Sequence, residues 1–383
     1  MKDVTLEFAR KLMIDFASLT GLEPVSDDPK RYLWTDAFAV CNYLELARLL
    51  NDEIYVDLAL RLVDQVHHTL GKHRNDDPRT GWLSGLKDEE GELHPTSGGL
   101  RIGKKLNERK PDEPYDDGLE WDQDGQYYHY LTKWMHALNR VARVTEDQKY
   151  NLWAVELAQS AHSAFTYLSP SGRKTMHWKM SIDLSYPLVP SMGQHDPLDG
   201  FVTYNELEVA AEDLGLSKSL AGEIAEIKDI CKGSYLTTND PLGIGGLLSD
   251  ASRVAQLMMK GLEYGDLLET ILDSGLLGMK SFGQENILRL PPHYRLAFRE
   301  LGLSIGLHGI EKLQDEMEEN SNLFGSFSMK QVESLVKYVP VGKSIENFWM
   351  KEENRKTINW TEHREINMVM LATSLIPGRF YNI

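Results

Sequence analysis

Helical periodicity runs through almost the whole chain and sets the first limit on its fold. Apolar residues recur every three to four positions in twelve stretches, whereas the two-residue period of a strand is nearly absent. The sequence therefore predicts an all-α protein, and a weakly alternating segment at 174–182 is compatible with a little β-structure. The expected helices span residues 3–20, 33–50, 54–72, 122–144, 147–168, 198–214, 218–232, 241–261, 264–276, 292–315, 328–338 and 360–376.

The connections between these helices alternate in length. Those after the second, fourth, sixth and eighth helices are short, namely 51–53, 145–146, 215–217 and 262–263. Those before the even-numbered helices are mostly long, namely 21–32, 73–121, 169–197, 277–291 and 339–359. Because short turns make neighbouring helices antiparallel, the alternation predicts six helical hairpins in series, with the long loops on one side.

The two kinds of helix also differ in composition. Even-numbered helices carry small residues where an inner ring would be crowded, namely Ala37, Ala39, Ala47, Gly243, Gly245, Gly246, Gly302 and Gly306. Odd-numbered helices such as 54–72 have one apolar stripe and one polar face, as covering helices do. We therefore expect two concentric rings of six helices in a single domain, residues 1–383. A superhelical solenoid is the competing architecture, but no self-similarity is found at its usual periods.

In this architecture, which involves essentially the whole chain, the sequence resembles the six-hairpin glycosidases, the (α/α)6-toroid superfamily. The resemblance rests on the hairpins more than on a diagnostic motif. It implies a carbohydrate-active enzyme, for which we expect a glycoside hydrolase first. Similar toroids include N-acylglucosamine epimerases, which use histidines as acid and base, and unsaturated-uronyl hydrolases, which use an aspartate to hydrate a double bond. Both remain alternatives.

The segments at the starts of the even-numbered helices share an unusual composition. Each contains a carboxylate, and five of the six contain Trp or His; they are residues 32–38, 119–130, 193–206, 238–246, 290–300 and 359–365. Pyranose rings pack on aromatic faces, while carboxylates bind hydroxyl groups and transfer protons. These segments therefore favour a small-molecule saccharide as the substrate. A non-catalytic sugar-binding or scaffold protein is the rival of a different class.

Paired carboxylates are the expected catalytic groups. Asp124 precedes Tyr127 by three positions and is expected on the same core-facing helical stripe, where a cap does not explain it. A glycosidase needs one carboxylic acid to protonate the leaving oxygen and a second carboxylate opposite it. The predicted catalytic residues are Asp124 or Asp122 as one partner and Asp36 or Asp199 as the other. Helix capping with internal salt bridges is the competing interpretation, and Asp196-Pro197 in particular has the pattern of a helix start.

Aromatic, histidine and arginine side chains of the same segments are the expected substrate-binding residues. They are Trp34, Trp121, Tyr127, His195, Tyr204, Arg295, Trp360 and His363. His195 and His363 keep the epimerase alternative open, and Arg295 keeps the uronyl-hydrolase alternative open. A salt bridge to one of the protein's own carboxylates is the simpler role for Arg295. The long loop 73–118 is expected to lie over the mouth of the site as a lid or to be disordered.

Cofactors and macromolecular partners are not indicated. The segment 98–106 approximates a phosphate-binding loop, but Lys105 replaces the required Ser or Thr, and no zinc or calcium motif is complete. The formal charge of −17 disfavours nucleic acid and anionic lipid as partners. The first residues lack a secretory signal, no apolar run could span a bilayer, and the chain has two cysteines. We therefore expect a cytoplasmic protein without a cofactor; the sequence does not indicate its oligomeric state.

Overall fold

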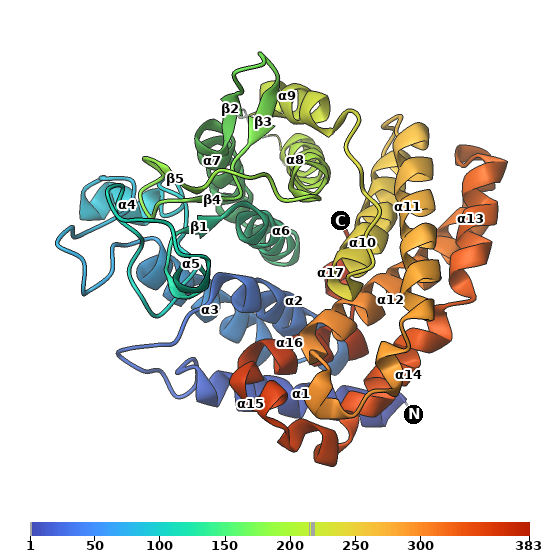
Figure 1. Ribbon diagram of the computed structural model, residues 1–383. Helices are drawn as coiled ribbons and strands as arrows, with labels where there is room; N and C mark the ends of the chain where they lie inside the picture. Colours follow the sequence, from blue (N-terminus) through green and yellow to red (C-terminus); the bar gives the residue numbers. More distant parts are fainter. Residues whose placement is uncertain (1, 214, 216–218) are drawn as a thin grey trace. The chain divides into compact units, whose positions relative to one another are not determined.

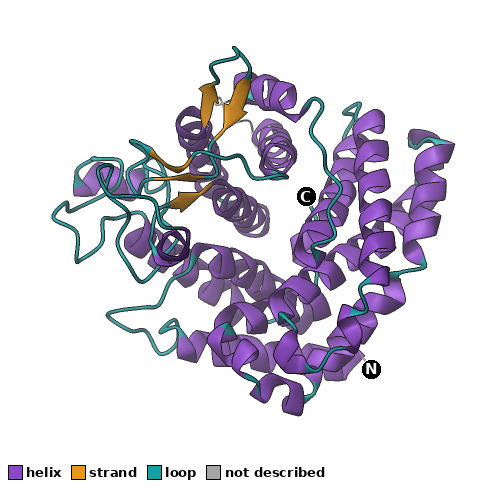
Figure 2. Ribbon diagram, viewed as in Figure 1, coloured by secondary structure: helices purple, strands orange, loops and turns teal. Residues whose placement is uncertain are grey.

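The computed structural model describes residues 2–213, 215 and 219–383 (Figure 1). Helices dominate the described chain and the strands are short, so the all-α prediction is confirmed (Figure 2). The chain divides into two compact units. One unit is Ala17–Ser234, and the other combines most of α1 (Lys2–Leu19) with Tyr235–Ile383. We describe each unit by itself.

The unit Ala17–Ser234 is built from three helical hairpins. The helices α2, α6 and α8 lie side by side, and each packs against the helix that follows it: α3, α7 and α9 (Figure 1). The bounds are α2 (Leu33–Leu50), α3 (Ile54–Leu70), α4 (Asp88–Leu93), α5 (Asp117–Asp122), α6 (Tyr128–Thr145), α7 (Gln148–Phe165), α8 (Asp196–Asp213) and α9 (Ala221–Cys231). The expected turn 215–217, and the helix ends expected at 214 and 218, lie wholly or partly outside the described residues.

Burial separates the central helices from the covering ones. Every residue of α2 from Leu33 to Ala47 is buried, polar residues included, whereas α3 buries one stripe. The first hairpin turn begins at Asn51 and the second at Glu146, and both residues adopt the left-handed conformation that ends a helix abruptly. The short turns therefore join a central helix to a covering one, as the sequence predicts.

Short strands connect the starts of α6 and α8. The strands β1 (Gln126–Tyr127), β4 (Lys179–Met180) and β5 (Pro187–Val189) form an antiparallel sheet in the order β1-β4-β5. A second pair joins β2 (Thr166–Leu168) to β3 (Lys174–Met176). The β-structure considered for 174–182 is thus present. In the first sheet Tyr127 pairs with Lys179, which fixes the residues immediately before α6.

The expected helix 122–144 is interrupted, and this part of the prediction is wrong. The short helix α5 ends at Asp122, the chain becomes extended, and α6 begins at Tyr128. Gly125 has φ +145, and a Cβ there would lie 2.7 Å from the carbonyl oxygen of Met180. Strand pairing and this glycine therefore break the helix. Asp124 lies in the extended segment and not on the helical stripe that the sequence suggested.

In the second unit, α10, α12 and α16 are packed as central helices. The bounds are α10 (Pro241–Met259), α11 (Gly265–Gln284), α12 (Ala297–Glu319), α13 (Ser326–Val336), α14 (Val339–Met350), α15 (Ile358–Glu362), α16 (Arg364–Leu375) and α17 (Gly378–Tyr381). α10 and α12 approach very closely, because a Cβ on Gly245 would lie 2.0 Å from the carbonyl oxygen of Gly302. The small residues of these helices allow the contact that their composition predicts.

Two loops expected in this unit are helical over part of their length. α11 continues to Gln284, although its end was expected at 276, and α14 occupies much of the expected loop 339–359. The buried residues Val339, Gly342, Ile345 and Trp349 of α14 recur every three to four positions, which is helical spacing. Pro340 lies in the first turn of this helix, where proline is tolerated.

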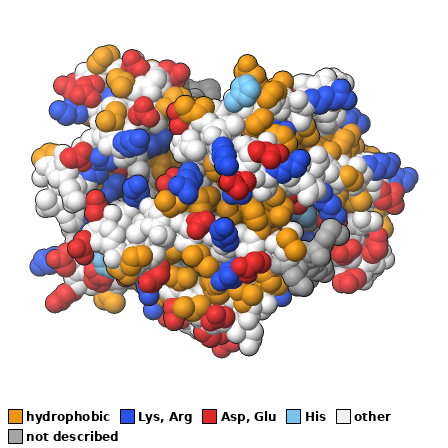
Figure 3. Space-filling model, turned by 90° about the horizontal axis from the view of Figure 1, so that it is seen from below, with side chains coloured by type: hydrophobic (Ala, Val, Ile, Leu, Met, Phe, Trp, Pro, Cys, Tyr) orange, Lys and Arg blue, Asp and Glu red, His pale blue; other side chains and the backbone are white. Residues whose placement is uncertain are grey.

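One face of the molecule carries charges of both signs. On the face seen in Figure 3, acidic and basic side chains alternate, with hydrophobic side chains between them. Within the part of the chain that the structure describes, no helix has both the length and the hydropathy needed to cross a bilayer.

Candidate functional site

Aromatic side chains gather around the start of α6. His129 stacks on Tyr127, with ring centroids 5.4 Å apart, and lies nearly parallel to Trp178 at 6.4 Å. Trp34, from the first turn of α2, meets the rings of His129 at 6.0 Å and Tyr130 at 5.3 Å. We call this surface the aromatic wall; its members are Tyr32, Trp34, Tyr127, His129, Tyr130 and Trp178.

The fold explains why these rings meet. α2 packs against α6, which brings Tyr32 and Trp34 to the residues that begin α6. The hydroxyl groups of Tyr32 and Tyr130 are hydrogen-bonded at 2.8 Å, and burial raises the pKa of Tyr32 to about 12. Pairing of β1 with β4 places Tyr127 next to the segment that carries Trp178. The wall is therefore neutral and is supplied by segments far apart in the sequence.

Asp196, the first residue of α8, lies against the wall. Its Oδ1 is 3.7 Å from Nδ1 of His129, and its side chain is 8% exposed. Burial raises the pKa of Asp196 to about 8, and repulsion by Asp199 adds to the rise while Lys133 opposes it. The carboxyl group of Asp196 is therefore mostly protonated at neutral pH.

His129 is neutral at the same pH. Desolvation by its surroundings lowers the pKa of His129 to about 4, partly opposed by the charge of Asp199. Among the described residues, Nδ1 of His129, Oδ2 of Asp196 and Nε1 of Trp34 are buried without a hydrogen-bond partner. Buried polar atoms are nearly always paired in proteins. Unpaired atoms on neighbouring side chains mark this place as a candidate site.

Asp199 follows Asp196 by three residues on α8. Thr132 Oγ1 donates a hydrogen bond to its Oδ2 at 2.5 Å, and the Lys133 ammonium lies 2.6 Å from its Oδ1. Side chains three apart on a helix have Cβ atoms about 5–6 Å apart. A protonated carboxyl group, Asp196, and an ion-paired carboxylate, Asp199, are therefore neighbours on the surface of one helix.

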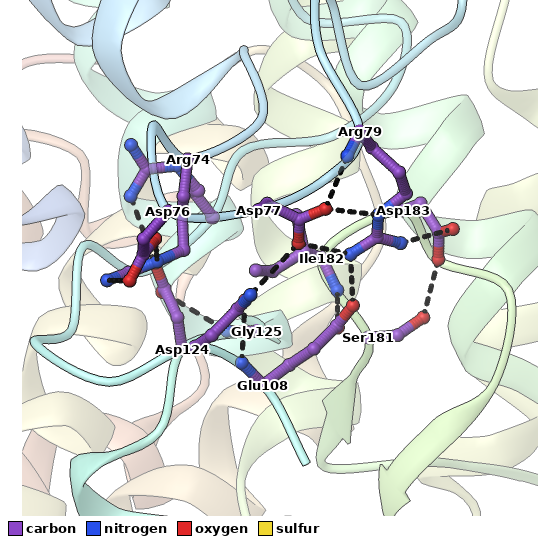
Figure 4. A network of polar contacts seen from close by, with 12 residues as sticks. Arg74, Asp76, Asp77, Arg79, Glu108, Asp124, Gly125, Ser181, Ile182 and Asp183 are labelled. Carbon is purple, nitrogen blue, oxygen red and sulfur yellow. Dashed lines mark hydrogen bonds and ion pairs between the residues drawn. The ribbon is translucent and has the colours of Figure 1, made fainter. Parts of the chain in front are cut away.

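Asp124, the first predicted catalytic carboxylate, is held in a different way. It is fully buried, and its Oδ2 lies 3.2 Å from Arg74 and 3.0 Å from Arg101. Its Oδ1 accepts hydrogen bonds from the backbone N–H groups of Gly103 and Gly125. Asp124 is shown with Arg74 and Gly125 in Figure 4. Both oxygens of Asp124 are thus used inside the protein, which supports a structural role.

Asp36 and Asp122, two further predicted carboxylates, have different surroundings. Asp36 accepts a hydrogen bond from the backbone of Tyr32 at 2.9 Å and lies 3.4 Å from Arg31. Burial raises the pKa of Asp36 to about 6, opposed by Arg31. Asp122 ends α5 and is exposed. Beside it, Trp121 is 51% exposed and touches Trp178 edge-on at 5.6 Å, so it extends the aromatic surface outward.

The remaining predicted binding residues of this unit differ in accessibility. Tyr204 is fully buried, and its hydroxyl group accepts a hydrogen bond from Tyr128 and donates one to the carbonyl oxygen of Ala158. His195 is half-buried and immediately precedes Asp196. Tyr204 therefore packs in the core, whereas His195 lies next to the candidate site.

Arg295, Trp360 and His363 belong to the other unit. Arg295 makes a bidentate salt bridge to Glu300 at 2.8 and 2.7 Å, and both side chains are buried. Trp360 is 4% exposed and stacks on Trp349 at 5.6 Å. His363 is exposed and touches Phe298 edge-on. The contacts of Arg295 and Trp360 support structural roles for both.

The long loop 73–118 is cross-linked by ion pairs. Arg79 lies 2.8 Å from Asp77, 2.5 Å from Glu108 and 2.8 Å from Asp183, so it ties the loop to the segment before β5 (Figure 4). Among the described residues, no group of three or more His, Cys, Asp or Glu side chains is arranged to hold a metal ion.

Solved structures with the same fold are found, although the sequences are very distant. A GH76 alpha-mannanase from Bacteroides thetaiotaomicron is 10% identical, with a TM-score of 0.54 over 98% of this chain and 97% of that one. A family 76 glycoside hydrolase from a bovine strain of the same species is 10% identical, with a TM-score of 0.53 over 98% and 78%. A cellobiose 2-epimerase from Bacillus thermoamylovorans is 13% identical, with a TM-score of 0.45 over 89% and 88%. The chain has the (α/α)6 fold of the six-hairpin glycosidases.

No protein-family model and no curated protein sequence matches the chain. The six-hairpin fold is therefore evident from the structure, while the chemistry has to be argued from the side chains.

Sequence reasoning overlooked two members of the candidate site, His129 and Asp196. His129 was hidden among the aromatic residues that begin α6. Asp196 was interpreted as a helix cap because it precedes Pro197. The available signal was the segment 193–206 itself, where His195, Asp196 and Asp199 occur within five residues. A cap accounts for one of those carboxyl groups, and the structure leaves Oδ2 of Asp196 unpaired among the described residues.

Proposed function

We propose that this protein is a carbohydrate-active enzyme, and that it hydrolyses a glycosidic bond at the aromatic wall. The observation that carries the proposal is Asp196, a buried carboxyl group with a pKa of about 8 and an unpaired oxygen among the described residues, beside rings on which a sugar can stack. The names of the two solved structures with the higher TM-scores, an alpha-mannanase and a glycoside hydrolase, agree with this chemistry.

Asp196 is the general acid in this proposal. It donates its proton to the oxygen of the leaving sugar as the C–O bond breaks. A water molecule adds its hydroxyl group to the anomeric carbon, and its other proton restores the protonated form of Asp196. Asp199, held by Lys133 and Thr132, provides negative charge for the oxocarbenium-like transition state. Paired carboxyl groups commonly take different catalytic roles because their surroundings give them different pKa values.

The aromatic wall binds the sugar. Trp34 meets the ring of His129 edge-on and Trp178 lies nearly parallel to it, and Nε1 of Trp34 can donate to a hydroxyl group. We propose Trp34 and His195 as substrate-binding residues, and Trp121 as an outer stacking position. Tyr127 is 3% exposed and stacks on His129, so in this proposal it positions His129. In this proposal Asp124, Asp36, Arg295 and Trp360 stabilise the fold.

An epimerase or isomerase is the second candidate, and one observation favours it. His129 is neutral because its pKa is held near 4, and its Nδ1 is unpaired among the described residues. A neutral imidazole can take a proton from the carbon next to the carbonyl group of an open-chain sugar, and Asp196 could return one.

Isotope labelling separates these functions. The protein is incubated with aryl glycosides, oligosaccharides and free sugars in H₂¹⁸O or in D₂O, and the products are analysed by mass spectrometry and NMR. Hydrolysis introduces one ¹⁸O at the bond that is cleaved, whereas epimerisation introduces deuterium next to the carbonyl carbon. A protein that binds sugars but changes none of them would contradict both catalytic proposals and support a binding protein.

A further inference from the structure

The cations close to Asp124 are paired, with one exception. Arg74 and Arg101 both contact the carboxylate of Asp124, and Arg74 also pairs with Asp76 at 2.7 Å. Lys104 follows directly on Gly103, whose N–H group binds the same carboxylate. Within the part of the chain that the structure describes, the Lys104 ammonium has neither a carboxylate partner nor a hydrogen bond.

The neighbouring cations on the other side are paired as well. The Glu120 carboxylate forms salt bridges with Arg109 at 3.2 Å and with Lys179 at 2.7 Å. The Lys179 ammonium also donates hydrogen bonds to the backbone carbonyl oxygens of Glu120 and Gln123. Arg74, Arg101, Arg109 and Lys179 share the three carboxylates of Asp76, Asp124 and Glu120. Lys104 therefore adds positive charge to a region where cations already outnumber the carboxylates that they contact, in a protein of net charge −17.

The position of Lys104 connects this charge to the aromatic wall. Its Nζ lies 5.6 Å from the ring centroid of Tyr32, whose hydroxyl group is bonded to Tyr130. The side chain is half-buried. Burial lowers the pKa of Lys104, and repulsion by Lys179 adds to this, while Asp122 and Asp124 act in the opposite direction. A partly desolvated ammonium group of this kind gains most from an anion that comes with a ligand.

We propose that Lys104 recognises a negatively charged group on the sugar, so that the enzyme prefers an anionic saccharide to its neutral counterpart. The inference rests on the proposed function and narrows its substrate class. A carboxylate and a phosphate group share the required chemistry, since the lysine ammonium is a compact charge that pairs with either. Stacking on the wall would hold the ring while Lys104 selects the charged substituent.

Matched sugars and matched lysine variants test this inference. The wild type, Lys104→Gln and Lys105→Gln are titrated, with tryptophan fluorescence as the signal, against glucose, mannose and galactose, their uronic acids and their 6-phosphates. Lys105 is the control because it is the exposed neighbour of Lys104. We expect the wild type and Lys105→Gln to bind an anionic member about tenfold more tightly than its neutral partner, with the preference declining as salt is added. Lys104→Gln should bind the neutral sugar unchanged and lose the preference.

Each outcome is decisive. A preference for uronic acids or for 6-phosphates identifies the carboxylate or the phosphate as the recognised group. Equal affinity for neutral and anionic sugars in the wild type, or a preference that survives in Lys104→Gln, would overturn the inference and leave the proposed function intact. If no sugar of the panel binds to the wild type, the proposed function itself is contradicted.

Discussion

Nδ1 of His129 lies 3.7 Å from Oδ1 of Asp196, and the environment moves the pKa values of the two groups in opposite directions. Burial raises the pKa of Asp196 to about 8, and desolvation lowers that of His129 to about 4. Near pH 7 the pair is therefore a neutral acid beside a neutral base. Such a pair can give and accept protons without first changing its net charge, which is what proton transfer to a sugar oxygen requires.

The raised pKa of Asp196 predicts a pH-dependent loss of stability. Its pKa of about 8 in the folded state lies above the roughly 3.9 of an unfolded chain, so its contribution is fully present below about pH 4 and is lost as pH rises through about 8. Asp196→Asn removes this titration. Urea unfolding at pH 5 and pH 8.5 should show a larger decrease for the wild type than for the variant. Equal decreases would contradict the assigned protonation state.

Asp124 is expected to matter for stability. Asp124→Asn leaves Arg74 and Arg101 without their shared carboxylate, and breaking a buried ion pair typically costs about 3–5 kcal/mol. Asp122→Asn is the matched control, since this exposed neighbour should change the free energy of unfolding by no more than about 0.5 kcal/mol. Denaturant titration of both variants measures the difference. A stable but inactive Asp124→Asn would instead restore the catalytic role first predicted for it.

The fold could be predicted from the sequence because its signals are local. Helical periodicity and hairpin turns that begin at Asn51 and Glu146 depend on neighbouring residues, and they survive in the structure. The break before α6 was not predictable in the same way, because it depends on pairing between β1 and β4, more than fifty residues apart. α14 was also missed, because it lies within the expected loop 339–359.

The site was less predictable, because its chemistry depends on distant partners. The sequence shows that Asp124 and Asp196 both lie in acidic segments at helix starts. It does not show that Arg74 and Arg101 neutralise Asp124, whereas Asp196 meets a neutral histidine from another helix. The same local pattern thus holds a structural ion pair at one position and a candidate acid at the other. The composition of the sequence identifies the two acidic segments, but only the long-range contacts show that Asp124 and Asp196 have different roles.

Trp34 should contribute to sugar binding through its N–H group. Trp34→Phe keeps an aromatic face but removes Nε1, which is unpaired among the described residues. Loss of one hydrogen bond to a sugar hydroxyl should weaken binding by up to about tenfold. Trp360→Phe is the control, because Trp360 is stacked in the core against Trp349. Isothermal titration with the sugar found by fluorescence measures both; equal affinities in the two variants would contradict the position of the wall.

Turnover by Asp196→Asn tests the central claim most directly. The amide preserves the size of the side chain but cannot donate a proton to the leaving oxygen, and losing a general acid typically costs roughly 100- to 10,000-fold in rate. Asp213→Asn, at the far end of the same helix and partly exposed, is the control. On the substrate identified by isotope labelling, we expect Asp196→Asn to fold and bind sugar while its kcat falls by that factor, and Asp213→Asn to keep the wild-type rate. A folded Asp196→Asn with wild-type kcat would contradict the account.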